Sequence, residues 1–459
     1  MTVDILITGG RLVEPDGSIE ASIAISGEEI VAVGSPEDLP AADEEIDASR
    51  NLVLPGAVDA HVHLDDHFSN DTYETASKAA ALGGTTTMLD FAWQAWVGEA
   101  SIFDEESTLL EGIERKQTKA EDSLVDYSLH GAITREDPAV FDELPEIIDR
   151  GVTSIKLFTA YEFGLPNGFI DQVFEEAAGH DLVAVLHTED SSVCEAITEQ
   201  FKREDKGEPE HYPQSRPDYT EAMAADDAIT MAMEAGCRYY GIHTTCQRAA
   251  EVIKDYRTEN RDMIRAETCV QYTVADDSLF EEIGLLPMAA PPLRKPADNE
   301  AMFEHLDRGT LDVVSTDHCG YTREQKQVYP WWEGTFGMNS VQRRLPVFHD
   351  EAVAERDFGY PFLVRKLATN PARIFGLANK GTLDPGTDAD IVIFDPDDTA
   401  PIDSAENASI ADFSVYEGRE VGSVEKTFVR GDLVADDGQI VGDPGHRAFV
   451  EREIPDWED

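Results

Sequence analysis

The chain has 459 residues, 93 Asp and Glu against 36 Lys and Arg, and a formal net charge of −57 at pH 7. Its 41 % hydrophobic content allows a buried core, unlike that of a disordered acidic protein. The charge argues against nucleic acid and anionic membranes as partners. Its spread along the chain, with only 12 lysines, favours a salt-adapted, halophilic protein, because salt screens self-repulsion. The alternative is an ordinary acidic protein.

Cysteine usage and hydropathy indicate the compartment. The cysteines are odd in number and lack CxxC spacing, which argues against a disulfide framework or a thiolate metal site. No apolar stretch approaches the ~18 residues of a membrane span, and the N-terminus lacks a basic signal-peptide region. We therefore expect a soluble, cytoplasmic protein with reduced thiols and no membrane partner.

Both flanks of the chain show the pattern of short β-strands. Residues 1–54 contain ILITGGRLV and SIAISGEEIVAVG, with turns at GG, DG and GE. Residues 380–459 repeat this pattern in ADIVIFDP and VEKTFVRGDLV. Each flank alone is too small for a core, and chain ends often lie close together. We therefore predict one small, discontinuous β-sandwich domain from residues 1–54 and 380–459.

The middle of the chain, residues 55–379, alternates strands with helices. Its strand candidates are VDAHVHL, GTTTMLDF, VDYSLHGAI, SIKLFTA, LVAVLHT, CRYYGIH, MIRAETCV and LDVVSTDHC. Helical stretches such as DTYETASKAAALG and DDAITMAMEAG separate them. This α/β pattern, with right-handed crossovers, predicts a TIM-like (β/α)8 barrel. The polar stretch 199–219 predicts an excursion on the active-site face, either a solvated connection or a lid or subunit contact.

Metal-capable residues end several of these strands. They are His61, His63, Lys156, His187, His243 and Asp317. The first two are two residues apart, so both side chains leave the same face of a strand. Because the C-terminal ends of barrel strands meet at one site, these residues should converge there. Imidazole and carboxylate ligands suit zinc, and the size of the set indicates two divalent metal ions.

Lys156 is the unusual member of this set, because an ammonium repels metals. Its neighbours Ile155, Leu157 and Phe158 indicate burial, and burial favours the neutral amine. A neutral amine can capture carbon dioxide as a carbamate, whose two oxygens could bridge two metals. The alternative is a salt-bridged lysine. His318 directly follows Asp317, so we expect it to point away from the ligands in a supporting role.

The chain resembles the dihydropyrimidinase/hydantoinase group of the amidohydrolase superfamily over nearly its full length. The shared segments are PGAVDAHVHLDD, GGTTTMLDF, IKLFTAY, LHTED, ETCVQY, APPLR, STDHC and NPARIFGLANKGTLDPGTDADIVIFDP, and stretch 199–219 carries an HxxxSRP element. The resemblance implies a hydrolase that opens a 5,6-dihydropyrimidine or hydantoin ring by attack of a metal-bridging hydroxide. It also implies a small cyclic amide as substrate and a homo-oligomer, either a tetramer or a dimer.

The resemblance further assigns roles to single residues. It divides the ligands into His61, His63 and Asp317 for one metal and His187 and His243 for the other, with carboxylated Lys156 bridging both. Tyr161 would stabilise the oxyanion, since a phenol can donate to a developing charge. Asp317 would carry a proton to the leaving nitrogen as general base and then acid. For Tyr161 the alternative is a buried core aromatic.

Two positions depart from the group's pattern. Ala290 replaces a serine before the Pro-Pro of APPLR, and Glu333 in WWEGTFG stands where an asparagine is usual. In the group, both positions serve the substrate largely through backbone groups, so the resemblance implies substrate contacts at Ala290, Glu333 and Tyr161. The LDD after HVH lacks the arginine of dihydroorotases, which argues against that activity.

Two alternatives to this activity stay open. One is allantoinase or another cyclic-ureide amidohydrolase with the same metal ligands. The remote one is a non-catalytic assembly protein of the same fold. Such proteins have lost metal ligands, whereas all six positions are intact in this chain.

Overall fold

A parallel β-barrel forms the centre of the computed structural model, which describes residues 2–98, 101–445 and 447–457. Its eight strands pair in chain order. A parallel bridge between Val62 and His318 joins the first strand to the last, so the predicted TIM-like barrel is confirmed. The strands are β8 (Ala57–Asp59), β9 (Thr85–Trp93), β10 (Asp126–Ala132), β11 (Ser154–Phe158), β12 (Val183–His187), β13 (Arg238–Gly241), β14 (Ile264–Cys269) and β15 (Val313–Ser315).

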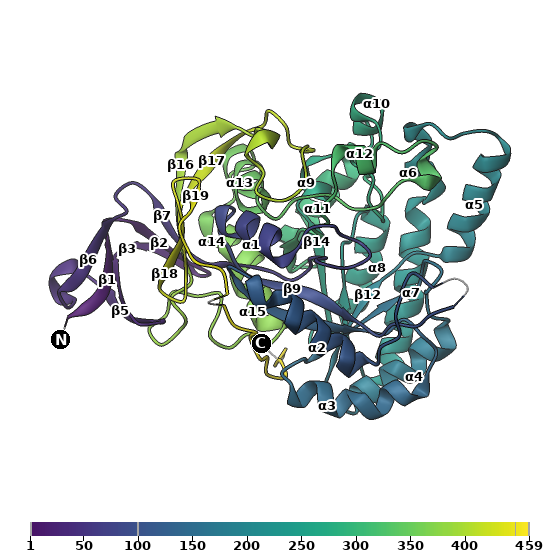
Figure 1. Cartoon of the computed structure of the whole chain (residues 1–459), viewed down its shortest axis with the longest axis horizontal. Coiled ribbons are helices and arrows are strands. Elements are labelled where there is room, and N and C mark those ends of the chain that lie inside the picture. The colour runs from purple at the N-terminus through teal and green to yellow at the C-terminus, as the bar shows by residue number, and fades with distance from the viewer. Residues whose placement is uncertain (1, 99–100, 446, 458–459) are drawn as a thin grey trace.

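Helices cover the outside of the barrel (Figure 1). The longer ones are α1 (Tyr73–Leu82), α2 (Leu109–Lys119), α4 (Asn167–Ala178), α5 (Ser191–Arg203), α7 (Asp218–Ala235), α8 (Gln247–Arg257) and α11 (Pro296–Asp307). The predicted helix at 71–83 is α1, whose N-cap Thr72 accepts a hydrogen bond from the Thr75 N–H. Among the described residues, no helix is long and apolar enough to cross a membrane.

Short helices fill the connections between these elements. They are η1 (Pro36–Asp38), η2 (Ala120–Asp122), η3 (Pro138–Glu143), α3 (Leu144–Asp149), η4 (Pro209–His211), α6 (Tyr212–Ser215), α9 (Gln271–Val274), α10 (Leu279–Ile283), α12 (Arg323–Lys326), η5 (Trp331–Glu333), α13 (Arg344–His349), η6 (Asp350–Glu355), α14 (Tyr360–Val364), η7 (Arg365–Thr369), α15 (Asn370–Ile374) and η8 (Ser404–Glu406). The excursion predicted at 199–219 is shorter than expected, because α5 continues to Arg203 and α7 begins at Asp218.

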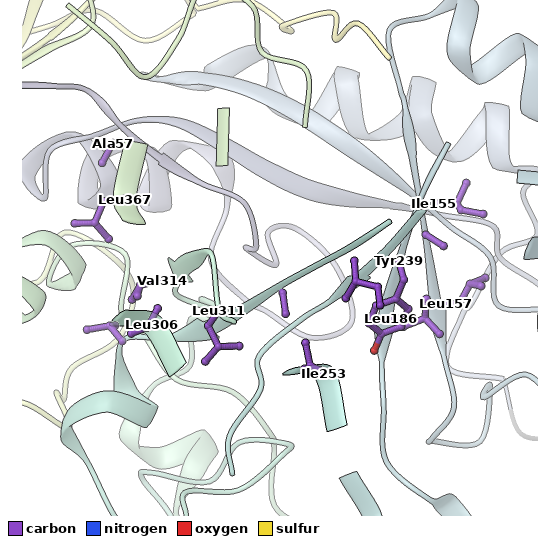
Figure 2. Packing of buried hydrophobic residues seen from close by; sticks show 14 of the residues in the cluster. Ala57, Ile155, Leu157, Leu186, Tyr239, Ile253, Leu306, Leu311, Val314 and Leu367 are labelled. Carbon is purple, nitrogen blue, oxygen red and sulfur yellow. The ribbon is translucent and has the colours of Figure 1, made fainter. Parts of the chain in front are cut away.

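The main core lies between the outer face of the barrel strands and the helices. Figure 2 shows part of it, including Ile155 and Leu157 of β11 and Leu186 of β12. Alternate residues of a strand point to opposite faces, so Lys156, between two core residues, points into the barrel. Because Ile155 and Leu157 pack against the helices outside the barrel, the alternation of the strand places the Lys156 amine inside it.

Two further sheets come from both flanks of the chain and lie beside the barrel (Figure 1). One contains β5 (Glu29–Gly34), β4 (Ser22–Ser26), β1 (Val3–Thr8) and β6 (Ala42–Asp47) in that order. The other contains β19 (Gln439–Ile440), β18 (Asp432–Asp436), β17 (Glu420–Val429), β16 (Ile391–Pro401), β7 (Leu52–Pro55), β2 (Arg11–Glu14) and β3 (Gly17–Glu20). Apolar residues of both sheets form one cluster, including Ile23 and Phe428, as a sandwich requires.

The C-terminal segment differs from the predicted division of the chain. After β19 it lies against the barrel, where Phe449 bridges to Tyr127 and Trp457 donates its Nε1–H to the Ile374 carbonyl at 3.1 Å. Trp457 joins Phe375 in the apolar cluster inside the barrel. The tail therefore closes the N-terminal end of the barrel, although the sequence pattern assigned it to the small domain at 380–459. The boundaries at residues 54 and 380 stay a prediction.

Candidate metal centre and active site

The structure brings all six predicted ligands together at the C-terminal end of the barrel. Lys156 lies in β11 and His187 ends β12, while the other four follow β8, β13 and β15. All six are buried and line one cavity. In a barrel of this kind, the C-terminal face is where catalytic sites are built.

Three residues of this site have left-handed backbone conformations. The φ angles are 36° for His243, 51° for Asp317 and 71° for Tyr161. Non-glycine residues rarely adopt such angles, and the strain persists only where the surrounding structure imposes it. At this cavity, three such conformations indicate that the direction of these side chains is constrained.

One predicted ligand set gathers around Asp317. Its Oδ1 lies 3.1 Å from His61 Nε2 and 3.5 Å from His63 Nε2. On the far side of the His61 ring, Nδ1 lies 2.8 Å from the Glu267 carboxylate. A carboxylate only accepts, so Nδ1 carries the hydrogen and Nε2 offers a lone pair to the cavity. One carboxylate and two imidazoles thus face the same point.

The electrostatics at this point favour positive charge. Burial lowers the pKa of His61, but the Asp317 and Glu267 carboxylates outweigh it and raise the value to about 9. For Asp317, burial raises the pKa, and the facing His61 and His63 bring it below its ordinary value. A cation between these groups, whether a proton or a metal ion, is therefore stabilised.

The other predicted ligand set is the pair His187 and His243. His187 Nδ1 lies 2.8 Å from His243 Nε2. His187 Nε2 lies 3.0 Å from the Glu189 carboxylate, so this nitrogen donates and Nδ1 keeps its lone pair. Burial lowers the pKa of His187 to about 4 and that of His243 well below its ordinary value. Two neutral imidazoles that face each other at this distance suit a shared metal ion.

Glu189 is in turn held by Arg216 from the HxxxSRP element. The guanidinium Nε lies 3.0 Å from Oε1, and Nη2 lies 2.8 Å from Oε2. Burial alone would raise the pKa of Glu189, but Arg216 and His187 bring it to about 2. The guanidinium carbon also lies 5.6 Å from the centre of the Tyr161 ring. The excursion therefore supports the site through Arg216.

Lys156 has the surroundings of a neutral amine. Its side chain is 1 % exposed, and burial lowers its pKa to about 7. Within the described part of the chain, Nζ has no hydrogen-bond partner and forms no ion pair, which argues against a salt-bridged lysine. Its nearest aromatic contact is the Phe158 ring, whose centre is 4.5 Å away. A buried amine without partners fits a group that is modified before use.

The walls of the cavity include two of the three predicted substrate contacts. Tyr161 and Ala290 line it, together with Phe336 and Gly337. Glu333 is exposed at the end of η5 and is not among the lining residues, whereas Phe336 and Gly337, which follow it in the chain, are. The Tyr161 ring centre lies 4.9 Å from that of His187. Burial raises the pKa of Tyr161 well above its ordinary value, so the phenol stays a donor.

Several contributors were not singled out from the sequence. Glu189 and Glu267 orient the imidazoles, and Cys319, Phe68 and Phe336 line the cavity. A signal existed for Glu189, which follows His187 by two residues. Phe68 and Phe336 lie on loops, where no periodicity indicates which side chain points inward.

His318 has the supporting place expected of it. Its Nε2 lies 3.0 Å from the Asp71 carboxylate, and its Nδ1 accepts a hydrogen bond from the Ser340 N–H at 3.1 Å. It does not line the cavity. It links the loop after β8 to the segment after η5.

Comparisons with known proteins agree with this geometry. The model of the amidohydrolase family matches residues 52–434. The chain is 33 % identical to a D-hydantoinase of Streptomyces coelicolor, covering 97 % of each chain, and 32 % identical to an allantoinase of Salmonella choleraesuis, covering 95 % of this chain and 96 % of that one. The crystal structure of dihydropyrimidinase from Brevibacillus agri NCHU1002 superposes with a TM-score of 0.93 at 29 % identity, covering 98 % of this chain and 99 % of that one. The chain belongs to the amidohydrolase family.

Proposed function

We propose that this protein is a metal-dependent hydrolase that opens the ring of a small cyclic amide or imide, a 5,6-dihydropyrimidine or a hydantoin. The observation that carries the proposal is the convergence of six ligand residues on one cavity in a chain related to a D-hydantoinase. Aromatic side chains, including Phe158 and Phe336, line the cavity beside the ligands.

The residues fit two divalent metal ions, with zinc favoured by imidazole and carboxylate ligands. His61, His63 and Asp317 would hold one, His187 and His243 the other, and Lys156, carboxylated at Nζ, would bridge them. The facing imidazole nitrogens and the partnerless Lys156 Nζ support this assignment. Bound metals of this kind supply a water of lowered pKa as nucleophile and polarise the carbonyl oxygen.

The protein's own groups would then direct the proton and the charge. Asp317 accepts a proton as the water oxygen bonds to the ring carbonyl carbon, and returns it to the ring nitrogen as the C–N bond breaks. The Tyr161 hydroxyl donates to the carbonyl oxygen while negative charge develops there. Glu189 and Glu267 keep the imidazoles of His187 and His61 in the orientation that ligation requires.

A second candidate substrate is allantoin. The allantoinase relative is 32 % identical to this chain, almost as similar as the D-hydantoinase relative at 33 %. The attacked group is a ring amide in both cases, so the same residues serve either reaction. A non-catalytic assembly role is disfavoured by the six ligand residues facing one cavity.

A substrate panel tests this proposal. Zinc-loaded protein in molar potassium chloride is incubated with dihydrouracil, hydantoin and allantoin, and ring opening is followed by loss of ultraviolet absorbance and by product chromatography. We expect turnover of at least one substrate and none by Asp317→Asn prepared in the same way. If the zinc-loaded wild-type protein opens none of the three, or if the variant equals it, the proposal is wrong.

We also propose the setting in which the enzyme works. The net charge of −57 supports a salt-adapted protein, and five buried free cysteines support a reducing, cytoplasmic location. Exposed Tyr219 and Met223, at 38 % and 48 %, lie one turn apart on α7 and support a homo-oligomer, either a tetramer or a dimer. Light scattering coupled to size exclusion in molar salt gives the oligomer mass, and a monomer would contradict this part.

A further inference from the structure

Lys326, the last residue of α12, is a fully buried amine outside the metal centre. Its side chain is 0 % exposed, and burial lowers its pKa to about 7. Its Nζ donates to three backbone carbonyls, at 2.5 Å for Met288, 2.8 Å for Thr335 and 2.8 Å for Gly337. Three acceptors match the three N–H donors of an ammonium. The amine therefore holds the segment around Met288 close to the segment 335–337.

The gathered segments form one wall of the cavity. Ala290 and Phe336 line it, and the Lys326 acceptors Thr335 and Gly337 are the two neighbours of Phe336. Met288, two residues before Ala290, also accepts the Gly337 N–H at 2.9 Å. The Lys326 amine thus connects the segment that contains Ala290 to the segment that contains Phe336. It contacts the residue on each side of Phe336.

In this wall, the main-chain groups of Ala290 and Phe336 lack hydrogen-bond partners within the described residues. In residues 2–98, 101–445 and 447–457, no hydrogen bond uses the backbone N–H or C=O of either residue. On both sides of Ala290 the carbonyls are occupied, Ala289 by the Tyr212 hydroxyl at 2.6 Å and Pro291 by the Tyr272 hydroxyl at 2.7 Å. Ala290 is buried and Phe336 is partly buried. Buried main-chain groups without partners are uncommon, so a ligand or water is expected to satisfy them.

We propose that Lys326 is a positioning residue that holds the main-chain groups of Ala290 and Phe336 against the amide edge of the substrate. The inference rests on the proposed function, since a cyclic amide presents the adjacent C=O and N–H groups that such a wall can bind. Side chains at these two positions carry no amide-binding group, so selection of the amide edge depends on where the backbone is held. Lys326 itself touches neither substrate nor metal.

Kinetics of Lys326→Met test the proposal, with Lys366→Met as matched control. Lys366 is another buried lysine, 5 % exposed, whose pKa burial lowers to about 8. It donates to the Leu311 carbonyl at 2.7 Å. Leu311 precedes β15, and neither residue lines the cavity. We expect Lys326→Met to raise KM for the ring substrate about 10-fold to 100-fold, the loss of two substrate hydrogen bonds, with kcat and metal content nearly unchanged. Lys366→Met should leave KM unchanged.

Other outcomes decide against the proposal or separate it from the proposed function. Equal KM in Lys326→Met and wild type, or an equal rise in Lys366→Met, would overturn it. If Lys326→Met does not fold, the same kinetics are measured on Lys326→Gln, which keeps two N–H donors. If neither variant folds while Lys366→Met does, Lys326 has a purely structural role and the proposal is wrong. Amide hydrogen exchange of segment 335–338 needs no substrate and should accelerate in Lys326→Met alone. Turnover by the wild-type enzyme tests the proposed function. The KM and the exchange rate of Lys326→Met relative to wild type test the role of Lys326.

Discussion

Replacing Tyr161 by phenylalanine should lower kcat and leave the rest of the protein unchanged. The ring centre lies 4.9 Å from the His187 ring and 5.3 Å from the Phe163 ring, and phenylalanine keeps these contacts. No hydrogen bond within the described residues uses the Tyr161 hydroxyl, so its removal deprives no other group of a partner. The loss is that of one oxyanion donor, ~10²–10³ in kcat or about 2.7–4 kcal/mol of barrier. The melting temperature and metal content should not change.

The assay compares steady-state ring opening, bound metal and thermal unfolding for wild type, Tyr161→Phe and the control Tyr127→Phe. Tyr127 is 6 % exposed at the start of β10, remote from the cavity, so the control removes the same atom from a barrel tyrosine. Its kcat should equal that of wild type. An unchanged kcat in Tyr161→Phe would refute the oxyanion role and leave a core aromatic. A fall in kcat that follows loss of metal would refute it as well.

Three further predictions concern the metal ligands and the solvent. Lys156→Ala should nearly abolish turnover, and acetate or formate should partly restore it by filling the space with an anion; most of the turnover surviving would exclude a bridging carbamate. Glu189→Gln should weaken metal binding ~10–100-fold in chelator competition, because His187 loses the carboxylate that orients it; unchanged affinity would contradict this. Melting temperature should rise along a potassium chloride series, since a net charge of −57 repels itself over a Debye length of about 30 Å at ~0.01 M salt and about 3 Å at ~1 M. A flat series would reject salt adaptation.

The barrel could be predicted because its signals are local. Each strand is a short apolar run, and the ligands stand in or just after these runs, so topology alone carries them to one face. Lys156 shows this well, because burial of Ile155 and Leu157 on one face of the strand decides that the amine points inward. Pairing of β7 with β16 could be inferred only from the insufficiency of each flank as a core.

Features that depend on long-range contacts could not be predicted in this way. The Glu267 that orients His61 lies 206 residues away in the chain, and no pattern in a single sequence pairs the two. Lys326 stands in the polar run TREQKQ, typical of a surface, yet it is fully buried because three carbonyls replace its water. The motif around Glu333 does not show which side chain lines the cavity, because the segment after η5 that contains Phe336 has no periodicity.

Metal titration of the wild-type enzyme tests the central claim most directly. Protein stripped with a chelator is given increasing zinc in bicarbonate-containing molar salt, and ring opening is measured at each addition together with bound metal. The six facing ligands predict activity that begins near zero and reaches its maximum at two metal ions per chain. Full activity without metal, or a maximum at one ion per chain, would contradict a binuclear hydrolase.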